Sequence, residues 1–254
     1  MKLIDTHIHA DARSSEDFEK MFISGIDTAI TCAFYPYELM SEIVLLNHLE
    51  RILNYDTERA KKYGIDLKVA LGIHPSNIIK SPKIVYDKLN GYIEKKSIVA
   101  IGEIGLEDLS NEEKNIFKKQ LKIADETDTN VIIHTPRKNK LEVLKEIKKM
   151  VLETIDPNLV IIDHINLDVI DEVIKEDFTL GLTVQPPQKM EVDEAVAILK
   201  EYGFDNFLLN SDISNMPSDP ISVPKTIRTL KKLGFDSKDI DKVSFKNAEK
   251  VFNL

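Results

Sequence analysis

Short runs of β-branched and other apolar residues alternate along the chain with longer amphipathic stretches rich in Lys and Glu. This alternation is typical of repeated βα units that build a parallel sheet. The number of strand-like runs is eight, which fits a closed barrel. They span residues 2–9, 28–33, 67–73, 98–103, 131–134, 159–164, 178–183 and 207–211.

Each strand-like run is followed by a stretch in which apolar residues recur every three or four positions, as in a helix. These stretches cover residues 15–24, 37–63, 82–95, 110–126, 139–153, 168–175, 192–202 and 223–233. Eight strand–helix pairs in 254 residues predict an α/β fold. We expect a single (β/α)8 TIM barrel that forms one domain over residues 1–254. A last segment, 236–252, predicts an extra C-terminal helix packed across one end of the barrel.

Composition narrows the class of protein. Hydrophobic residues make up 43% of the chain and charged residues 30%, a balance typical of a globular protein. A strand-like pattern begins at once and no apolar run is long enough to span a bilayer, so we expect a cytoplasmic protein with no membrane partner. The net charge of −9 opposes stable binding of nucleic acid, although it is compatible with a local basic groove. The sequence does not specify an oligomeric state.

Cysteine content limits the kind of metal site. Cys32 is the only cysteine, which excludes an intramolecular disulfide and a multi-thiolate site. A metal must therefore use nitrogen and oxygen ligands. Imidazole-rich ligation without thiolates suits Zn²⁺, Mn²⁺, Ni²⁺, Co²⁺ or Fe²⁺ better than Ca²⁺ or Mg²⁺.

Five of the six histidines fall at predicted carboxyl ends of strands: His7, His9, His74, His134 and His164. In a barrel these ends converge on one mouth, where the active sites of this fold lie. His7 and His9 have the two-residue spacing of a strand, which puts both imidazoles on one side, where they can bind the same ion. Asp5 shares that face one layer deeper, where it either bonds one of these imidazoles or makes an ordinary buried hydrogen bond. Taken singly, a histidine at a strand end is more often a structural residue.

Two carboxylates complete the pattern. Glu103 follows the apolar run 98–102, and its two oxygens can bridge two cations. Asp212 follows the eighth strand in the same way, although an Asp in that position is often the N-cap of the next helix. Combined with the histidines on strands one, five and six, the two carboxylates predict a metal centre at the mouth of the barrel.

The motifs around these residues resemble those of TatD-related metal-dependent hydrolases, a family of the amidohydrolase superfamily. The resemblance is carried by Asp-Thr-His-Ile-His at 5–9, Gly-Ile-His-Pro at 72–75, Ala-Ile-Gly-Glu-Ile-Gly-Leu at 100–106 and Ile-Ile-His at 132–134. It extends to residues 117–124 before the fifth strand and to 247–252 at the C-terminus, and so covers nearly the whole chain.

The resemblance implies a binuclear centre that holds two divalent metal ions. In this arrangement His7 and His9 hold one ion, His134 and His164 hold the other, Glu103 bridges the two, and Asp212 sits beside the first. Two cations roughly 3.5–4 Å apart can deprotonate a shared water near neutral pH, and the bridging hydroxide is then the nucleophile. Asp212 is the natural general base or proton shuttle, so Asp212 and Glu103 are the candidate catalytic residues.

The sequence differs from the family where substrate is handled. Members with nuclease activity tend to have an Arg two residues after the strand-five His, a position that Pro136 occupies here, with Arg137 next to it. After the strand-six His, Ile-Asn-Leu at 165–167 stands where the family usually has an aromatic-small-Gly turn. Before the strand-eight Asp, Asn-Ser at 210–211 stands where the family has a Glu-Ser/Thr pair. His74 and Arg137 are the candidate substrate contacts.

Three functions fit these observations. The first is a TatD-type phosphoesterase or DNase acting on a nucleic-acid end, a nucleotide or another small phosphoester. The second is amidohydrolase-type cleavage of a C–N or carboxylic ester bond, which attack of the same hydroxide on a carbonyl would achieve. The third is a non-catalytic metal-binding barrel, against which the complete ligand set with its proton-shuttle residue Asp212 argues.

Overall fold

The computed structural model describes residues 2–254, so the first residue of the predicted domain 1–254 lies outside the described residues. Eight strands pair in parallel in two sheets, ordered β1-β2-β3 and β4-β5-β6-β7-β8. They are β1 (Leu3–Ile8), β2 (Ile26–Cys32), β3 (Asp66–Ala70), β4 (Ile101–Gly105), β5 (Val131–His134), β6 (Val160–Ile162), β7 (Thr179–Thr183) and β8 (Phe207–Asn210). Each predicted strand is confirmed, with ends that shift by a few residues.

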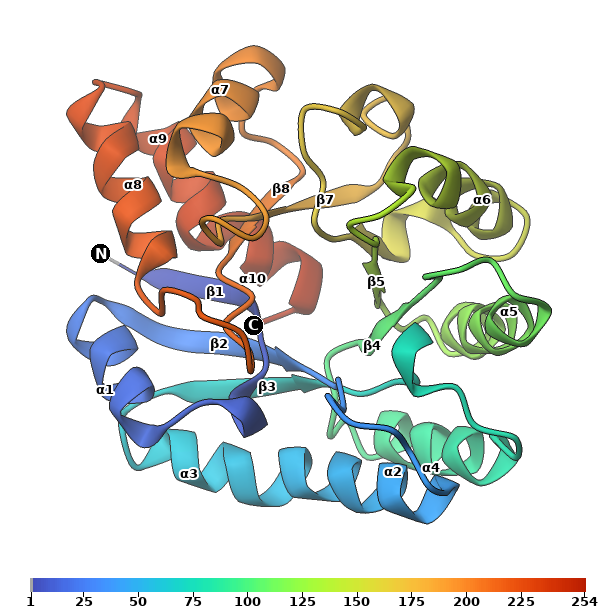
Figure 1. The fold of residues 1–254 in the computed structure, drawn as a ribbon. Helices are drawn as coiled ribbons and strands as arrows, with labels where there is room; N and C mark the ends of the chain where they lie inside the picture. The colour runs from blue at the N-terminus through green and yellow to red at the C-terminus, as the bar shows by residue number, and fades with distance from the viewer. Residues whose placement is uncertain (1) are drawn as a thin grey trace.

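Backbone hydrogen bonds connect the two sheets at both of their junctions. Between β3 and β4, Val99 N donates to Val69 O at 2.9 Å. Where the chain leaves β8, Asp212 N donates to His7 O of β1 at 2.9 Å. The helices lie around the outside of the strands (Figure 1). The α/β class is confirmed, and the arrangement is consistent with the predicted (β/α)8 TIM barrel.

Side chains from both sheets meet inside the ring of strands, as expected for a TIM barrel whose interior is filled by layers of side chains. The C-terminal segment packs against the same cluster, as predicted for residues 236–252. This cluster joins Ala248 and Phe252 to Ile4, Ile30, Cys32, Ala70, Ala100, Ile132, Ile161 and Leu208. Asn130, just before β5, donates to Val251 O at 2.7 Å, and Asn247 donates to the carbonyl of Phe207, the first residue of β8, at 2.8 Å. The C-terminal segment therefore covers the amino end of the barrel and leaves the carboxyl ends of the strands open for a site.

The long helices match the predicted stretches closely, apart from a later start of the second. They are α1 (Ser15–Ile23), α2 (Glu42–Glu50), α4 (Lys83–Glu94), α5 (Asn111–Glu126), α6 (Lys140–Leu152), α7 (Val192–Tyr202) and α8 (Ser222–Lys232). Shorter helices are α3 (Thr57–Lys61), α9 (Ser237–Asp241) and α10 (Asn247–Phe252), and π-helical turns join α2 to α3 and α9 to α10. In α5 the Ser110 hydroxyl accepts a hydrogen bond from Glu113 N, and the apolar face is buried against the sheet.

Two predicted helical stretches were wrong in part. The stretch 168–175 forms only a 3-10 turn, Ile170–Glu172. Its apolar periodicity comes largely from β-branched residues, which are buried here but favour helices less than unbranched ones do. The predicted helix 37–63 begins instead at Glu42, after Ser41, a residue type that commonly precedes the first helical turn.

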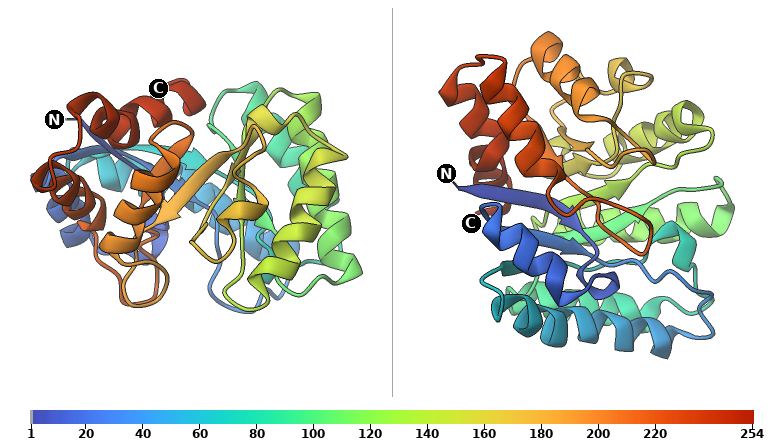
Figure 2. Two further views of the ribbon diagram at one scale, coloured as in Figure 1. Left: turned by 90° about the horizontal axis from the view of Figure 1, so that it is seen from above. Right: turned by 60° about the vertical axis from the view of Figure 1, so that its left-hand side comes forward.

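Lys2, just before β1, pairs with Glu249 of α10 at 2.6 Å, so the start of β1 lies beside the C-terminal helices (Figure 2). Among residues 2–254, no helix is both long enough and apolar enough to cross a membrane.

Candidate metal centre

The six residues predicted as metal ligands meet at the carboxyl ends of the strands. His7 lies in β1, Glu103 in β4 and His134 at the last position of β5. His9 directly follows β1, and His164 and Asp212 come two residues after the ends of β6 and β8. All six are buried except His134, which is half-buried. The predicted convergence is therefore present, built from His7, His9, Glu103, His134, His164 and Asp212.

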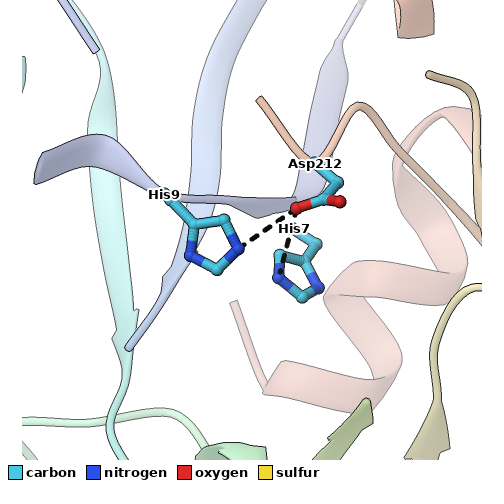
Figure 3. Close-up of side chains that lie close together, drawn as sticks. All are labelled: His7, His9 and Asp212. Atoms are coloured by element: carbon cyan, nitrogen blue, oxygen red, sulfur yellow. Dashed lines mark ion pairs between the residues drawn. The ribbon is translucent and has the colours of Figure 1, made fainter. Parts of the chain in front are cut away.

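One group of side chains combines the first strand with the end of the eighth. His9 Nε2 lies 3.1 Å from Asp212 Oδ1, and His7 Nε2 lies 3.9 Å from the same oxygen (Figure 3). Because the imidazole nitrogens and the carboxylate oxygen face one another, these three side chains can hold one cation.

Glu103 divides its two oxygens between two pairs of histidines. Oε1 lies 2.9 Å from His134 Nδ1 and 3.0 Å from His164 Nε2. Oε2 lies 3.4 Å from His7 Nε2 and 3.7 Å from His9 Nε2. A carboxylate placed in this way can bridge two metal ions, one beside each histidine pair.

In His7, His9 and His164 a hydrogen bond on Nδ1 turns Nε2 toward the centre. His7 Nδ1 lies 2.6 Å from Asp163 Oδ2, and His7 Nε2 is buried without a hydrogen-bond partner. His9 Nδ1 donates to Cys32 O at 3.0 Å, and His164 Nδ1 bonds the Thr183 hydroxyl at 2.7 Å. Partners of this kind orient metal-binding imidazoles, and a buried unpaired nitrogen aimed at two carboxylates fits a cation. The donor set therefore fits divalent ions.

Charge also favours cation binding. Burial raises the pKa of Glu103, but the adjacent His7 and His134 imidazoles lower it, and the net pKa lies well below its usual range. For Asp212, burial again raises the pKa, while the neighbouring ammonium of Lys189 and the bond to His9 bring it well below its usual range. Both carboxylates are thus ionised at neutral pH.

Asp212 and His164 have backbone conformations that L residues seldom adopt. Their φ angles are +44° and +63°, in the left-handed region. Non-glycine residues held there are strained and cluster at functional sites. Asp212 caps no helix, because α8 begins ten residues later at Ser222, so the N-cap alternative for Asp212 is wrong.

Asp5 does not bond an imidazole. Its carboxylate accepts hydrogen bonds from Ser211 N at 3.0 Å and from the Ser211 hydroxyl, and its nearest link to His7 is through the backbone N–H. Burial raises the pKa of Asp5 to about 7. Of the two alternatives for Asp5, the ordinary buried hydrogen bond is the one present, and Asp163 takes the role beside the imidazole.

Lys189 is a site residue that sequence reasoning missed. It lies in the loop between β7 and α7, and its Nζ donates to Asp212 Oδ2 and to His164 Nε2, the latter at 3.0 Å. Glu107 is a second such residue, with Oε2 2.9 Å from His134 Nε2. No motif or periodicity marks either position in the sequence.

The two predicted substrate contacts line a cleft of about 470 Å³ above the centre. His74 Nδ1 accepts a hydrogen bond from Ser76 N at 3.0 Å. Burial and the nearby His134 lower the pKa of His74 well below its usual range, so the ring is neutral and Nε2 is the donor. Arg137 lies at the exposed rim, where it donates to Gln188 Oε1 at 3.1 Å. Phe34 forms one wall, with its ring centre 4.8 Å from that of His74.

Known proteins resemble this chain over nearly its full length. A family model described as TatD related DNase matches residues 4–253. An uncharacterized metal-dependent hydrolase of Methanocaldococcus jannaschii is 41% identical over 253 residues, which are 99% of this chain and 100% of the relative. The crystal structure of a TatD-like protein from Archaeoglobus fulgidus has a TM-score of 0.84 and 27% identity, and covers 99% of this chain and 100% of its own.

A more distant structure shares the fold. The phosphotriesterase homology protein of Escherichia coli, solved with phosphate in its active site, has a TM-score of 0.73 and 14% identity. The match covers 99% of this chain and 98% of the other.

Proposed function

Since the chain belongs to the TatD related DNase family and is a metal-dependent hydrolase, we propose that it cleaves phosphoester bonds with two divalent ions bound on either side of Glu103. The observation that supports this most directly is the division of the Glu103 oxygens between His7 with His9 and His134 with His164. When bound, two such ions lower the pKa of water and stabilise charge on the entering and leaving oxygens. The nitrogen-rich donor set favours Zn²⁺, Mn²⁺, Ni²⁺, Co²⁺ or Fe²⁺.

Asp212 is the residue best placed to move a proton. Its Oδ1 faces His9 and His7, while its Oδ2 accepts a hydrogen bond from Lys189. The low pKa of Asp212 keeps the carboxylate ionised, so it can accept a proton from attacking water and return it to the leaving group.

Cations and hydrogen-bond donors around the cleft support a phosphoester as substrate. Arg137 and Lys189 line the cleft, and the neutral His74 offers Nε2–H to a substrate oxygen. Positive groups at the place where negative charge develops stabilise phosphoryl transfer. A small phosphoester or a nucleic-acid end is thus the proposed substrate, with no stable nucleic-acid complex because the chain has a net charge of −9.

Cleavage of a C–N or carboxylic ester bond is the second candidate. Pro136 stands where nuclease members of the family tend to have Arg. The guanidinium that such an Arg would place near the scissile bond is therefore found one position later, on Arg137 at the rim. A carbonyl substrate needs less positive charge than a phosphoester does.

A panel assay separates these candidates. Metal-reconstituted protein is tested with a generic phosphodiester, a phosphomonoester, single-stranded DNA and an N-acyl substrate, with metal content measured by elemental analysis. We expect close to two ions per chain and turnover of a phosphoester faster than of the N-acyl compound. Turnover of the N-acyl compound alone would favour the second candidate, and no turnover by the folded, metal-loaded protein would indicate a non-catalytic barrel.

A pair of variants tests the bridge in the same assay. Glu103→Gln removes the charge and one of the two anionic oxygens, so we expect loss of at least one metal ion and of turnover. Glu112→Gln, the same change at an exposed position of α5, is the matched control and should keep both. Unchanged metal content and turnover in Glu103→Gln would contradict a bridging role.

A further inference from the structure

A small cavity lies beside the metal cleft, between the loop that joins β5 to α6 and the loop that joins β7 to α7. Its volume is about 130 Å³. This is less than the roughly 300–1,000 Å³ of pockets that hold drug-sized ligands, so the cavity fits a group of few atoms. Its polar lining comes from Thr135, Arg137, Lys140, His164, Asn166, Thr183, Gln188 and Lys189.

The cavity and the cleft share part of their lining. Arg137, His164 and Lys189 contribute to both. His164 is one of the proposed metal ligands, and Lys189 bonds both it and Asp212. A group held in the cavity would therefore lie next to a bond attacked at the metal centre, with Lys189 between the two.

Two cations of the cavity lack an acidic partner. Lys140 Nζ donates to the Thr135 hydroxyl at 3.0 Å and to His164 O at 2.7 Å, both of which are uncharged. Arg137 donates to the neutral amide oxygen of Gln188. Within the described part of the chain, neither side chain has a carboxylate oxygen within 4.0 Å. In a protein of net charge −9, cations left unpaired at one recess indicate an anionic ligand.

The position of Lys140 also favours an anionic ligand. It is the first residue of α6, where backbone N–H groups give a helix a partial positive charge, and the Asn139 side chain does not cap them. Lys140 is half-buried and shares the cavity with the ammonium of Lys189. Holding a cation in such surroundings is unfavourable unless an opposite charge joins it.

We propose that the cavity lined by Arg137, Lys140 and Lys189 is an anion subsite that holds a second phosphate group of the substrate. The inference rests on the proposed phosphoester hydrolase and narrows its substrates to those with two neighbouring phosphates, such as a nucleoside bisphosphate or the end of an oligonucleotide. Arg and Lys donors grouped around a small recess match the several oxygens and the double charge of a phosphate.

Titration calorimetry with inorganic phosphate tests the subsite without requiring turnover. Metal-loaded full-length protein should bind two phosphate ions per chain, one at the metal centre and one in the cavity. Lys140→Met and Arg137→Met should each weaken the second event by about tenfold or more, as expected for losing a charge-assisted hydrogen bond. Lys140→Met also removes the hydrogen bonds of Lys140 to Thr135 and His164, which affects the structure of the loop. Arg137 is exposed, so Arg137→Met tests the subsite without that loss.

The control variant is Lys145→Met, which removes the same charge from an exposed position of the same helix and should keep both binding events. A single phosphate per wild-type chain, or a second one that both cavity variants bind as tightly as wild type, would overturn the subsite. Acetate binding to the cavity as tightly as phosphate would overturn the assignment to phosphate. Two phosphates bound by a protein that hydrolyses no phosphoester would leave the subsite standing and reject the proposed function.

Discussion

The Asp163 carboxylate holds the His7 imidazole in place, with Oδ2 2.6 Å from Nδ1. The other oxygen of Asp163 accepts a hydrogen bond from the Asn210 amide at 3.1 Å, so the carboxylate is itself held. His7 Nε2 therefore points to Glu103 and Asp212 with no other partner. A ligand orientation set by such a partner contributes to metal affinity as well as to the choice of tautomer.

Asp163→Asn should weaken metal binding while keeping the fold. The amide has nearly the same shape but no charge, so His7 loses basicity and its fixed orientation, and we expect metal affinity to fall by about 10–100-fold. The measurement is competition with a chelator, alongside thermal melting. Asp171→Asn, a change outside the centre, is the control. Equal affinity for metal in the Asp163→Asn protein and wild type would show that Asp163 has only a structural role.

Gly181→Ala should disturb the same interaction from the opposite side. A Cβ at Gly181 would lie 1.5 Å from Asp163 Oδ1, so the carboxylate would have to leave its present position beside His7. We expect a lower free energy of unfolding, by about 1–3 kcal/mol as is usual for overpacking, and weaker metal binding. Gly91→Ala in α4 meets nothing within 4 Å and should be neutral or stabilising, because alanine favours helices more than glycine does. Wild-type metal affinity in Gly181→Ala would show that metal binding does not depend on the position of the Asp163 carboxylate beside His7.

The stability effect of Lys140 should depend on pH. Its pKa in the folded protein is about 7, against 10.5 for an ordinary lysine, so the unfolded chain binds more protons between these values. The contribution of Lys140 to the free energy of unfolding of wild type should therefore increase as pH rises from 7 to 10.5. Lys140→Met lacks this increase. Relative to wild type, the free energy of unfolding of the variant should therefore be highest at pH 7 or below and should fall toward pH 10.5.

Chemical denaturation at several pH values measures this difference. The exposed Lys145→Met should show a constant difference from wild type over the same range. A constant difference for Lys140→Met as well would show that burial does not lower the pKa of Lys140.

Sequence patterns were sufficient for the strands and the histidine-rich centre because both depend on local order. An apolar run marks a strand, and parallel strands bring their carboxyl ends together, so His7, Glu103 and His134 could be placed at one mouth before any distance was known. The ring also explains why residues separated by more than a hundred positions meet.

Residues that act through a partner distant in sequence could not be found this way. Asp163 stands beside His164 in the sequence, but its partner His7 is 156 positions away, and only the order of strands brings them together. Lys189 lies in a loop without periodicity and is one of many lysines, so nothing local separates it from surface residues. The stretch 168–175 shows that a local pattern can also mislead. Its buried β-branched residues have the spacing of a helix, but the stretch forms only a 3-10 turn.

Asp212→Asn should separate catalysis from structure. Asp212 caps no helix, and its carboxylate lies between His9 and Lys189. The amide cannot accept the proton of attacking water, so we expect turnover of the best phosphoester to fall by about 10²–10⁴-fold, the usual contribution of a general base. The four histidines and Glu103 should still hold metal, so metal content and melting temperature should stay close to those of wild type. Asp219→Asn, the same change at the Asp219–Lys225 ion pair outside the centre, is the control and should keep full activity. Full activity in a folded, metal-loaded Asp212→Asn protein would rule out the proton-transfer role.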